Sequence, residues 1–225
     1  MSEDNDTDAA GRSSAEKTRA ALIEAGLRLF GEKGFAATST REIAAEAKAN
    51  IGSIAYHFGG KGELRDACAA HIVETIARVA DPVLATMPPP TDRAAAEAQL
   101  RIATERMAGF LVAAPEMSSF VQFILREIHH PGRAFDILYA GLVEKVHRRL
   151  CAVWAVASGD DAESEATKIA VFTMIGQTVY FRIAREAVLR RMGWREIGAT
   201  EAGLITATVL ENALAALAAH RERKP

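Results

Sequence analysis

Hydrogen-bond donors suited to phosphate oxygens stand at the expected starts of two helices. Thr40 and Arg41 fall in the first turn of one helix, and Lys61 falls in the first turn of a longer one. Free backbone N–H groups and the helix dipole favour an anion at such positions. Between these helices, the outer face expected of a third helix is small and moderately polar, which suits the major groove of DNA. The members of that face are Ile51, Ser53, Ala55, Tyr56 and His57.

A structural interpretation of the same residues stays open. Tyr56 fits a protein core, and Arg41 and Lys61 fit ordinary solvated charges. The net charge of −2 also opposes binding to a polyanion. This charge is unevenly distributed, with −4 over residues 1–11, +3 over residues 12–65 and −1 over the remainder. The distribution excludes a nonspecific polycation and leaves DNA binding through a few placed contacts.

Capping signals predict the first two helices. Ser13, followed by Glu three residues later, opens a first helix that ends at Gly34. Ser39, with the same spacing to a Glu, opens a much shorter helix over residues 40–47. We therefore expect one long helix followed closely by a helix of about two turns.

A tight turn over residues 48–50 leads into a third helix, 51–57, which Asn50 is expected to cap. Two glycines then precede a long fourth helix from Lys61 to about residue 80. Two short helices joined by about three residues have the spacing of a helix-turn-helix. Because a two-turn helix buries too little apolar surface to form alone, the pair predicts that its outer face serves binding.

Several motifs between residues 18 and 64 match one family of DNA-binding proteins. They are Leu29-Phe30, Glu32-Lys33-Gly34-Phe35, Thr38-Ser39, Ile43-Ala44, Ala47, Tyr56-His57-Phe58, Lys61 and Glu63-Leu64. Through them the segment resembles the DNA-binding domain of the TetR family of transcriptional regulators, with a helix-turn-helix over 39–58. The resemblance implies that phosphates are held by Thr40, Arg41, Tyr56, His57 and Lys61, and that bases are faced by Asn50, Ile51, Ser53 and Ala55.

Two positions depart from the pattern of that family. Lys48 stands where a turn glycine is usual, so a residue with a Cβ must take the turn conformation at some local cost. Ala55 stands where a tyrosine is usual, which removes one potential contact and leaves a small surface for a thymine methyl group.

The segment Met87-Pro88-Pro89-Pro90 cannot lie inside a helix and divides the chain. We expect a disordered acidic tail over 1–11, a DNA-binding domain with its connecting helix over 12–80, and a regulatory and dimerisation domain over 91–225. Few alternating β-branched runs occur, so the predicted fold class is all-α, with about nine helices. The last five are expected at 92–113, 116–129, 133–157, 161–191 and 200–221.

Two C-terminal motifs, residues 134–139 and 176–186, are similar to the CecR-like branch of the TetR family. In that family the last two helices pair with their copies across a two-fold axis. The resemblance implies a homodimer formed through residues 169–181 and 204–217. The two DNA-binding domains of this dimer would bind a palindromic operator in double-stranded DNA.

The resemblance also implies a repressor that a small-molecule effector releases from its operator by shifting a conformational equilibrium. Apolar and polar side chains in the C-terminal half are candidates for the effector site. They are Met107, Phe110, Phe123, Arg126, Glu127, Tyr139, Met174, Gln177 and Tyr180. Aromatic and methionine side chains at helical spacing are more often part of a protein core than of a ligand site. Gln177 is the exception, because its side-chain amide needs hydrogen-bond partners, either on an effector or on its own copy across the dimer.

An enzyme or a metal-responsive regulator is the competing class. Glu127 with His129 and His130 offers metal-ligand chemistry, as does Glu144 with His147 in half of a di-metal bundle motif. The second copy that such a bundle needs is absent from the sequence, and no phosphate-binding loop or nucleophile elbow occurs. We therefore expect no catalytic residue, no bound metal and no cofactor.

Cys68 and Cys151 are expected to be small buried hydrophobes. The apolar runs 169–181 and 204–219 are interrupted by polar residues and fall short of a bilayer's roughly 20 residues. Without a targeting segment, we expect no membrane contact and a cytoplasmic location.

Overall fold

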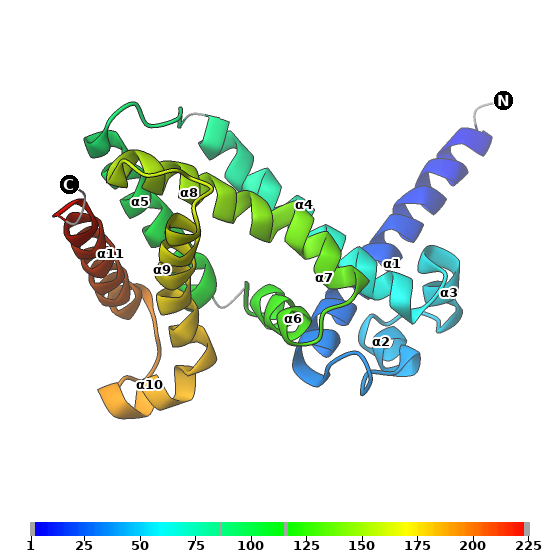
Figure 1. Cartoon of the computed structure of the whole chain (residues 1–225). Helices are drawn as coiled ribbons and strands as arrows, with labels where there is room; N and C mark the ends of the chain where they lie inside the picture. Colours follow the sequence, from blue (N-terminus) through cyan, green and yellow to red (C-terminus); the bar gives the residue numbers. More distant parts are fainter. Residues whose placement is uncertain (1–2, 86, 115–116, 223–225) are drawn as a thin grey trace. The chain divides into compact units, whose positions relative to one another are not determined.

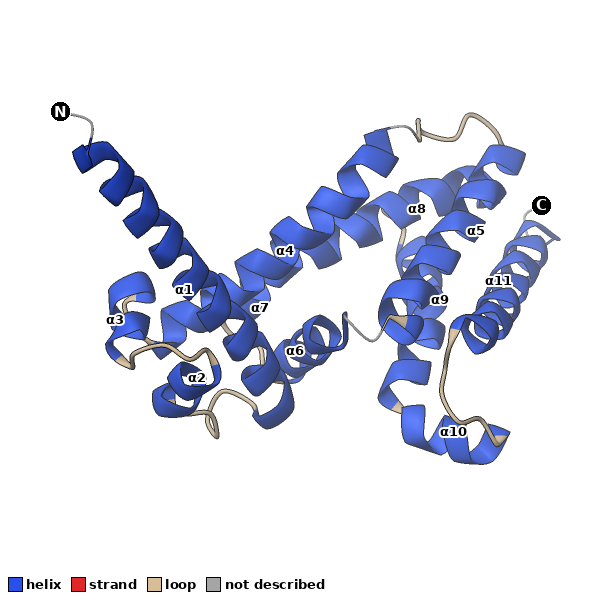
Figure 2. Ribbon diagram, turned by 180° about the vertical axis from the view of Figure 1, so that it is seen from behind, coloured by secondary structure: helices blue, strands red, loops and turns tan. Residues whose placement is uncertain are grey.

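A computed structural model describes residues 3–85, 87–114 and 117–222. Within these ranges every regular element is a helix (Figure 1, Figure 2), which confirms the predicted all-α class. The chain forms two compact units. The first comprises residues 1–81 and 119–142, and the second comprises residues 82–118 and 143–225.

Unit 1 contains the helix-turn-helix and two further helices from the middle of the chain. Its elements are α1 (Glu3–Lys33), α2 (Thr40–Glu46), α3 (Gly52–Phe58), α4 (Lys61–Ala85), α6 (Ser118–His129), α7 (Arg133–Leu138) and the π-helix η3 (Tyr139–Val143). The core that joins them is mainly apolar and includes Leu22, Leu27, Phe30, Ile43, Ile54, Leu64, Ile72 and Phe123. Gly26 lets α1 and α4 approach closely, because a Cβ there would lie 2.9 Å from the sulfur of Cys68.

The long first helix begins earlier than its capping signal predicts. The expected tail over 1–11 is helical from Glu3 onward, so the predicted start at Ser13 was wrong. No proline interrupts this segment of the sequence. A helix can therefore propagate through the position of the internal capping signal.

Residues 119–142 belong with the N-terminal helices and not with the rest of the expected C-terminal domain. The rings of Phe30 on α1 and Phe123 on α6 pack with their centroids 6.5 Å apart. Arg126 on α6 donates to the carbonyl of Glu32 at 2.7 Å, and Arg133 on α7 pairs with Asp66 on α4 at 3.1 Å. These contacts join segments far apart in the sequence.

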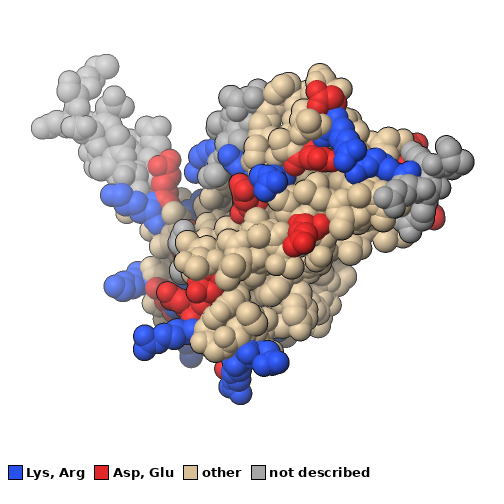
Figure 3. All heavy atoms as spheres, turned by 90° about the vertical axis from the view of Figure 1, so that its left-hand side faces the viewer, with Lys and Arg blue, Asp and Glu red and all other residues tan. Residues whose placement is uncertain are grey.

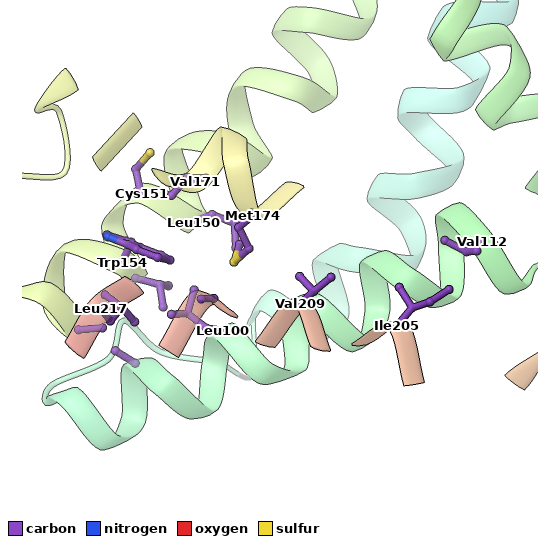
Figure 4. Close-up of a cluster of buried hydrophobic side chains, with 14 of the residues drawn as sticks. Leu100, Val112, Leu150, Cys151, Trp154, Val171, Met174, Ile205, Val209 and Leu217 are labelled. Atoms are coloured by element: carbon purple, nitrogen blue, oxygen red, sulfur yellow. The ribbon is translucent and has the colours of Figure 1, made fainter. Parts of the chain in front are cut away.

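Unit 2 is built from α5 (Arg93–Ala108), the π-helix η1 (Gly109–Ala113), α8 (Glu144–Ser158), α9 (Glu165–Ile183), α10 (Arg185–Met192) and α11 (Ala199–Glu222). Figure 4 shows side chains from α5, α8, α9 and α11 converging on a shared apolar core. Its buried members include Leu100, Leu150, Trp154, Val171, Met174, Val209 and Leu217.

Three of the predicted helices are interrupted. The stretch 92–113 divides into α5 and the π-helix η1. The stretch 133–157 divides into α7, η3 and α8, and Gly141 of η3 lies against Val73, where a Cβ would come within 2.7 Å. The stretch 161–191 divides at Ala184, whose φ of −93° and ψ of 20° depart from helical values. These interruptions separate elements that the hydrophobic pattern joined.

Both cysteines are buried and free, which confirms their predicted structural role. Burial raises the pKa of the Cys68 thiol, and burial is also the main cause of the raised pKa of Cys151. Neither thiol is therefore activated toward the thiolate form.

Helix α11 is long and apolar enough to cross a membrane by length and composition, with a mean hydropathy of 1.5 over its most apolar window. One side of it, however, packs into unit 2 through Ile205, Val209, Ala213 and Leu217. Core helices of globular proteins meet the same criteria, so its composition is explained by this packing.

Candidate nucleic-acid interface

Helix α2 is held at its start by the predicted capping box. The Ser39 hydroxyl accepts from the backbone N–H of Glu42 at 3.1 Å, and the Glu42 carboxylate accepts from the N–H of Ser39 at 2.8 Å. The same carboxylate lies 3.0 Å from the ammonium of Lys33 at the end of α1. The cap thus fixes α2 against α1 and presents Thr40 and Arg41 in its first turn, where Arg41 is exposed.

These hydrogen bonds make α2 sensitive to acid. The pKa of Glu42 is lowered to about 2, first by the backbone hydrogen bond from Ser39 and then by Lys33. A lowered pKa contributes stability that is present above the unfolded value and is lost as the pH falls through the folded value. The contribution of Glu42 should therefore disappear between about pH 4.5 and about pH 2.

We expect Glu42→Gln to remove this pH dependence. Urea midpoints of the wild type and the variant should differ at neutral pH and converge as the pH falls toward about 2, because the charge is then lost from both proteins. Comparing the two proteins cancels the acid titration of every other carboxylate. An equal difference across that pH range would contradict the assignment.

The turn between α2 and α3 contains the predicted strained residue. Lys48 has a φ of 52° and is the one non-glycine with positive φ in the described part of the chain. The N–H of Ala49 bonds to the carbonyl of Ala44 at 2.9 Å, which closes the end of α2. The Asn50 side-chain oxygen accepts from the N–H of Gly52 at 2.9 Å, which stabilises the turn. The predicted cap at Asn50 was wrong, because α3 begins one residue later than expected, so its N-cap position is Ile51, which makes no side-chain capping bond.

Lys48→Gly is expected to raise the free energy of unfolding by about 0.5 to 1 kcal/mol, because glycine takes a positive φ without steric cost. Lys48→Ala is the matched control, since it removes the same charge and keeps the Cβ. Chemical denaturation should separate the two variants. Equal stabilities would show that the strain at this turn is negligible.

Helix α3 turns one side inward and the other outward. Ile54 is 2% exposed and anchors the helix, whereas Tyr56 is 82% exposed. The His57 ring lies edge-on to that of Tyr56, with centroids 4.9 Å apart. Ile51 and Ala55 are also exposed, while Ser53 and His57 are half-buried. The predicted base-facing and phosphate-facing residues of α3 therefore share an accessible surface.

Lys61 has a structural role that its sequence position did not reveal. Its ammonium donates to the carbonyls of Phe35 and Thr38, both at 2.8 Å, and lies 4.1 Å from the centroid of the Phe35 ring. An ammonium has three N–H groups, so one is left for a phosphate. Lys61 thus fixes the loop before α2 and contributes to the interface chiefly by positioning it.

Arg65 on α4 ties the helix-turn-helix to α6. Its guanidinium donates to both carboxylate oxygens of Glu127, at 2.7 and 2.5 Å, and Glu127 is 2% exposed. It also lies 5.0 Å from the Phe35 ring. Arg65 and Glu127 lie 62 residues apart in the sequence, so no local sequence pattern predicts that they pair.

The structure does not bring all the predicted effector residues into one unit. Phe123, Arg126, Glu127 and Tyr139 belong to unit 1, and Arg126 and Glu127 hold the ends of α1 and α4. The others, Met107, Phe110, Met174, Gln177 and Tyr180, belong to unit 2. Gln177 has a partner that was not foreseen, because its side-chain oxygen accepts from Asn212 on α11 at 2.8 Å.

An open hollow of about 320 Å³ lies in unit 1 beside the α2–α3 turn, and none of the predicted effector residues lines it. Ala21, Glu24, Ala25, Arg28, Glu46, Ala47, Lys48 and Ser119 line it. An ion pair between Arg28 and Glu46 occupies part of its wall.

The side chains of four of the five residues of the metal hypothesis have other partners. The carboxylate of Glu127 accepts hydrogen bonds from Arg65, and the Nδ1 atom of His129 lies 2.7 Å from the carbonyl oxygen of Leu125. His147 stacks on Phe172 with centroids 3.8 Å apart, and Glu144 pairs with Arg148. Across the described ranges, His, Cys, Asp and Glu side chains form no group of three suited to a metal ion.

Comparison with known proteins identifies both halves of the chain. Residues 22–68 match the bacterial regulatory proteins of the tetR family, and residues 96–220 match the C-terminal domain of the HTH-type transcriptional dual regulator CecR. The CecR protein of Shigella flexneri is 34% identical over 201 residues, which cover 86% of this chain and 88% of that protein.

Solved structures show the same fold. A TetR-family regulator from Mesorhizobium loti has a TM-score of 0.61 at 16% identity, covering 90% of this chain and 97% of that one. AibR, solved with isovaleryl coenzyme A and operator DNA, has a TM-score of 0.61 at 15% identity, covering 86% and 96%. These matches overturn the enzyme alternative. The chain belongs to the TetR family of DNA-binding transcription regulators and carries a C-terminal domain of the CecR type.

Proposed function

We propose that the protein is a homodimeric repressor that binds a palindromic operator through α2 and α3 and leaves it when a small-molecule effector binds. The observation that carries the DNA interface is the exposure of Tyr56, 82% on a helix of seven residues. An aromatic side chain exposed to this degree contributes almost nothing to folding. Its phenol is available to a phosphate oxygen beside the groove that α3 would enter.

Within this interface we assign phosphate contacts to Thr40, Arg41, Tyr56 and His57 and base contacts to Asn50, Ile51, Ser53 and Ala55. The Asn50 side-chain oxygen already accepts from Gly52, so its NH₂ group is the part left for a base. The small side chains at 53 and 55 permit close approach of α3 to the base edges. Lys61 supports the interface by holding the loop before α2.

An apolar stripe on α9 supports the dimer. Ile169, Phe172, Tyr180 and Ile183 are 55% to 65% exposed, and their spacing places them on one face of the helix with Gly176 among them. Figure 3, which views the molecule from the side of α11 in Figure 1, shows a wide surface with few charged side chains. Leu204 on α11 is 57% exposed as well. An exposed apolar face of this kind is typical of a protein–protein interface.

We expect Ile183→Glu to raise the dimer dissociation constant about 100-fold, because the symmetry of the dimer brings two buried like charges into one interface. Val156→Glu, at an apolar side chain of α8 that is 38% exposed and off the stripe, is the matched control. Analytical ultracentrifugation at micromolar concentration measures both. A monomeric wild-type protein would contradict the dimer.

The effector is proposed to bind in unit 2, which contains Met174 in its core and the half-buried side chains of Met107 and Phe110. AibR supports this assignment, because one protein of the same fold was solved with both a small molecule and operator DNA. Binding of an effector weakens DNA binding only to the extent of its differential affinity for the two conformations. A regulator of this kind acts where the chromosome lies, in the cytoplasm.

The proposed function is tested with DNA selected by the protein from a random pool. Binding should be specific and should weaken steeply as the salt concentration rises, because phosphate contacts release counterions. Repression is tested by placing the selected sequence across a reporter promoter with and without the protein. If transcription rises when the protein is added, the protein is an activator at this promoter and the proposed repression is wrong. The relative from Shigella flexneri is named a dual regulator.

A further inference from the structure

Two arginines at the junction of α9 and α10 have no carboxylate partner in the described ranges. Arg182 donates to the hydroxyl of Ser118 at 2.6 Å and to its carbonyl at 3.4 Å. Arg185 donates to the carbonyl of Val112 at 3.3 Å. A guanidinium has five N–H groups, and the other donors of these two find no acceptor among the residues that the structure describes. Each arginine thus keeps hydrogen-bonding capacity for a further group.

The surroundings of these arginines favour an anion. The pKa of Arg182 is lowered, chiefly by burial and further by the positive charge of Arg185. Neighbouring Arg190, by contrast, is exposed and pairs with Glu186 at 2.6 Å. Two like charges that are partly removed from water are unfavourable unless a negative group joins them.

A buried hydroxyl lies one helical turn before Arg182. Thr178 is 0% exposed, and its hydroxyl has no hydrogen-bond partner. Residues four apart share a face of a helix, so Thr178 and Arg182 are neighbours on the inner side of α9, with buried Met174 one turn further back. An unpartnered buried hydroxyl is costly, and a ligand atom is the kind of partner that it lacks.

The backbone facing this side of α9 is irregular. Val112, whose carbonyl receives Arg185, belongs to η1, and η1 packs against α9. Short π-helical segments are rare and are frequently found at functional sites. The π-helical segment and the last turns of α9 thus bring together cationic, hydroxyl and apolar groups.

We propose that Arg182, Arg185 and Thr178 bind the oxyanion head of an organic acid or phosphate ester whose apolar body lies along α9 toward Met174. Guanidinium groups bind carboxylate and phosphate through paired N–H bonds, and the Thr178 hydroxyl meets a further oxygen of the ligand. The identification of this ligand with the effector rests on the proposed function. The oxyanion site itself is inferred from the arginines and Thr178 and does not depend on that function.

The position of Ser118 supplies a route from this site to the DNA-binding unit. Ser118 is the first residue of α6, and the chain passes from unit 2 to unit 1 directly after it. An anion that recruits the Arg182 guanidinium competes with the bonds from Arg182 to Ser118. Because Arg126 and Glu127 of α6 hold α1 and α4, a shift at the start of α6 reaches the helices that carry the helix-turn-helix.

The site is tested by isothermal titration calorimetry on the full chain without DNA, with octanoate, octyl phosphate and octanol as probes. At least one of the two anions should bind, and octanol should bind at least about 10-fold more weakly. Arg182→Gln and Arg185→Gln should each weaken anion binding about 10- to 100-fold, and Arg190→Gln should leave it unchanged. Equal binding of octanol, or unchanged affinity in both arginine variants, would overturn the proposal.

Thr178→Val separates a ligand contact from a structural role. Valine has nearly the same shape, and it removes an unpartnered buried hydroxyl, so the melting temperature should rise while anion affinity falls. An unchanged affinity would remove Thr178 from the site. Glu116 lies outside the described residues, and if Glu116→Gln tightened anion binding more than about 10-fold, the chain itself would be the partner of the arginines and the proposal would fail.

Operator binding measured separately distinguishes this proposal from the proposed function. Octanoate or octyl phosphate should lower operator affinity for the wild type and not for Arg182→Gln. A protein that binds its operator but neither anion would reject the oxyanion site alone. A protein that binds an anion through these arginines but binds no operator would reject the regulator model and keep the site.

Discussion

Replacing Tyr56 by alanine is expected to weaken operator binding about 30-fold and to leave the free energy of unfolding unchanged. The side chain is 82% exposed and touches little besides the edge of His57, so folding loses almost nothing. A hydrogen bond from the phenol to a phosphate is worth about 1 kcal/mol, and a dimer makes it twice. The loss should be the same for specific and nonspecific DNA, since a phosphate contact carries no sequence information.

Fluorescence anisotropy with labelled operator measures this effect, and thermal unfolding checks the fold. Tyr139→Ala is the matched control, because that tyrosine is 45% exposed and lies in η3, outside the helix-turn-helix. Arg41→Ala should reduce the slope of log affinity against log salt concentration by about two per dimer, because each DNA-binding domain loses one positive charge that contacts a phosphate. Operator affinity within about two-fold of the wild type for Tyr56→Ala would mean that α3 does not approach the phosphates as proposed.

The second large effect is expected at Glu127. Glu127→Ala should lower the free energy of unfolding by about 3 kcal/mol, because it leaves the largely buried Arg65 guanidinium without its two carboxylate oxygens. Glu127 belongs to α6 and Arg65 to α4, so the variant also loosens α6 from the helices that position α2 and α3.

Urea denaturation of Glu127→Ala, Arg65→Ala and the double variant gives the coupling between the two side chains. The double variant should lose much less than the sum of the single ones, since it leaves no uncompensated charge. Glu144→Ala is the control, because its pair with Arg148 is exposed and should contribute less than about 1 kcal/mol. Additive losses at 65 and 127 would contradict a coupled buried pair.

The sequence predicts the helix-turn-helix well because its signals are local. The capping box of Ser39 and the turn at Lys48 depend on residues within a few positions of one another, and both are present in the structure. The start of α1 was missed for the same reason. A capping signal at Ser13 says nothing about whether the helix can also propagate upstream of it.

The rest of the candidate site depends on contacts that local patterns do not contain. Lys61 donates to carbonyls 23 and 26 residues away, and Arg126 bonds to a carbonyl 94 residues away. From the sequence these cations resemble phosphate or effector ligands, whereas in the fold they hold helix ends and loops. Gln177 is similar, because its partner Asn212 lies on another helix.

The most direct test of the central claim is a hydroxyl-radical footprint on DNA that the full chain selects from a random pool. If two copies present α3 to successive major grooves, the protected sequence should be an inverted repeat whose half-site centres lie about 10 base pairs, or a multiple of that, apart. Tyr56→Ala should leave this pattern in place at a higher protein concentration. A single unrepeated protected site, or protection without sequence preference, would contradict a dimer that reads a palindrome through α3.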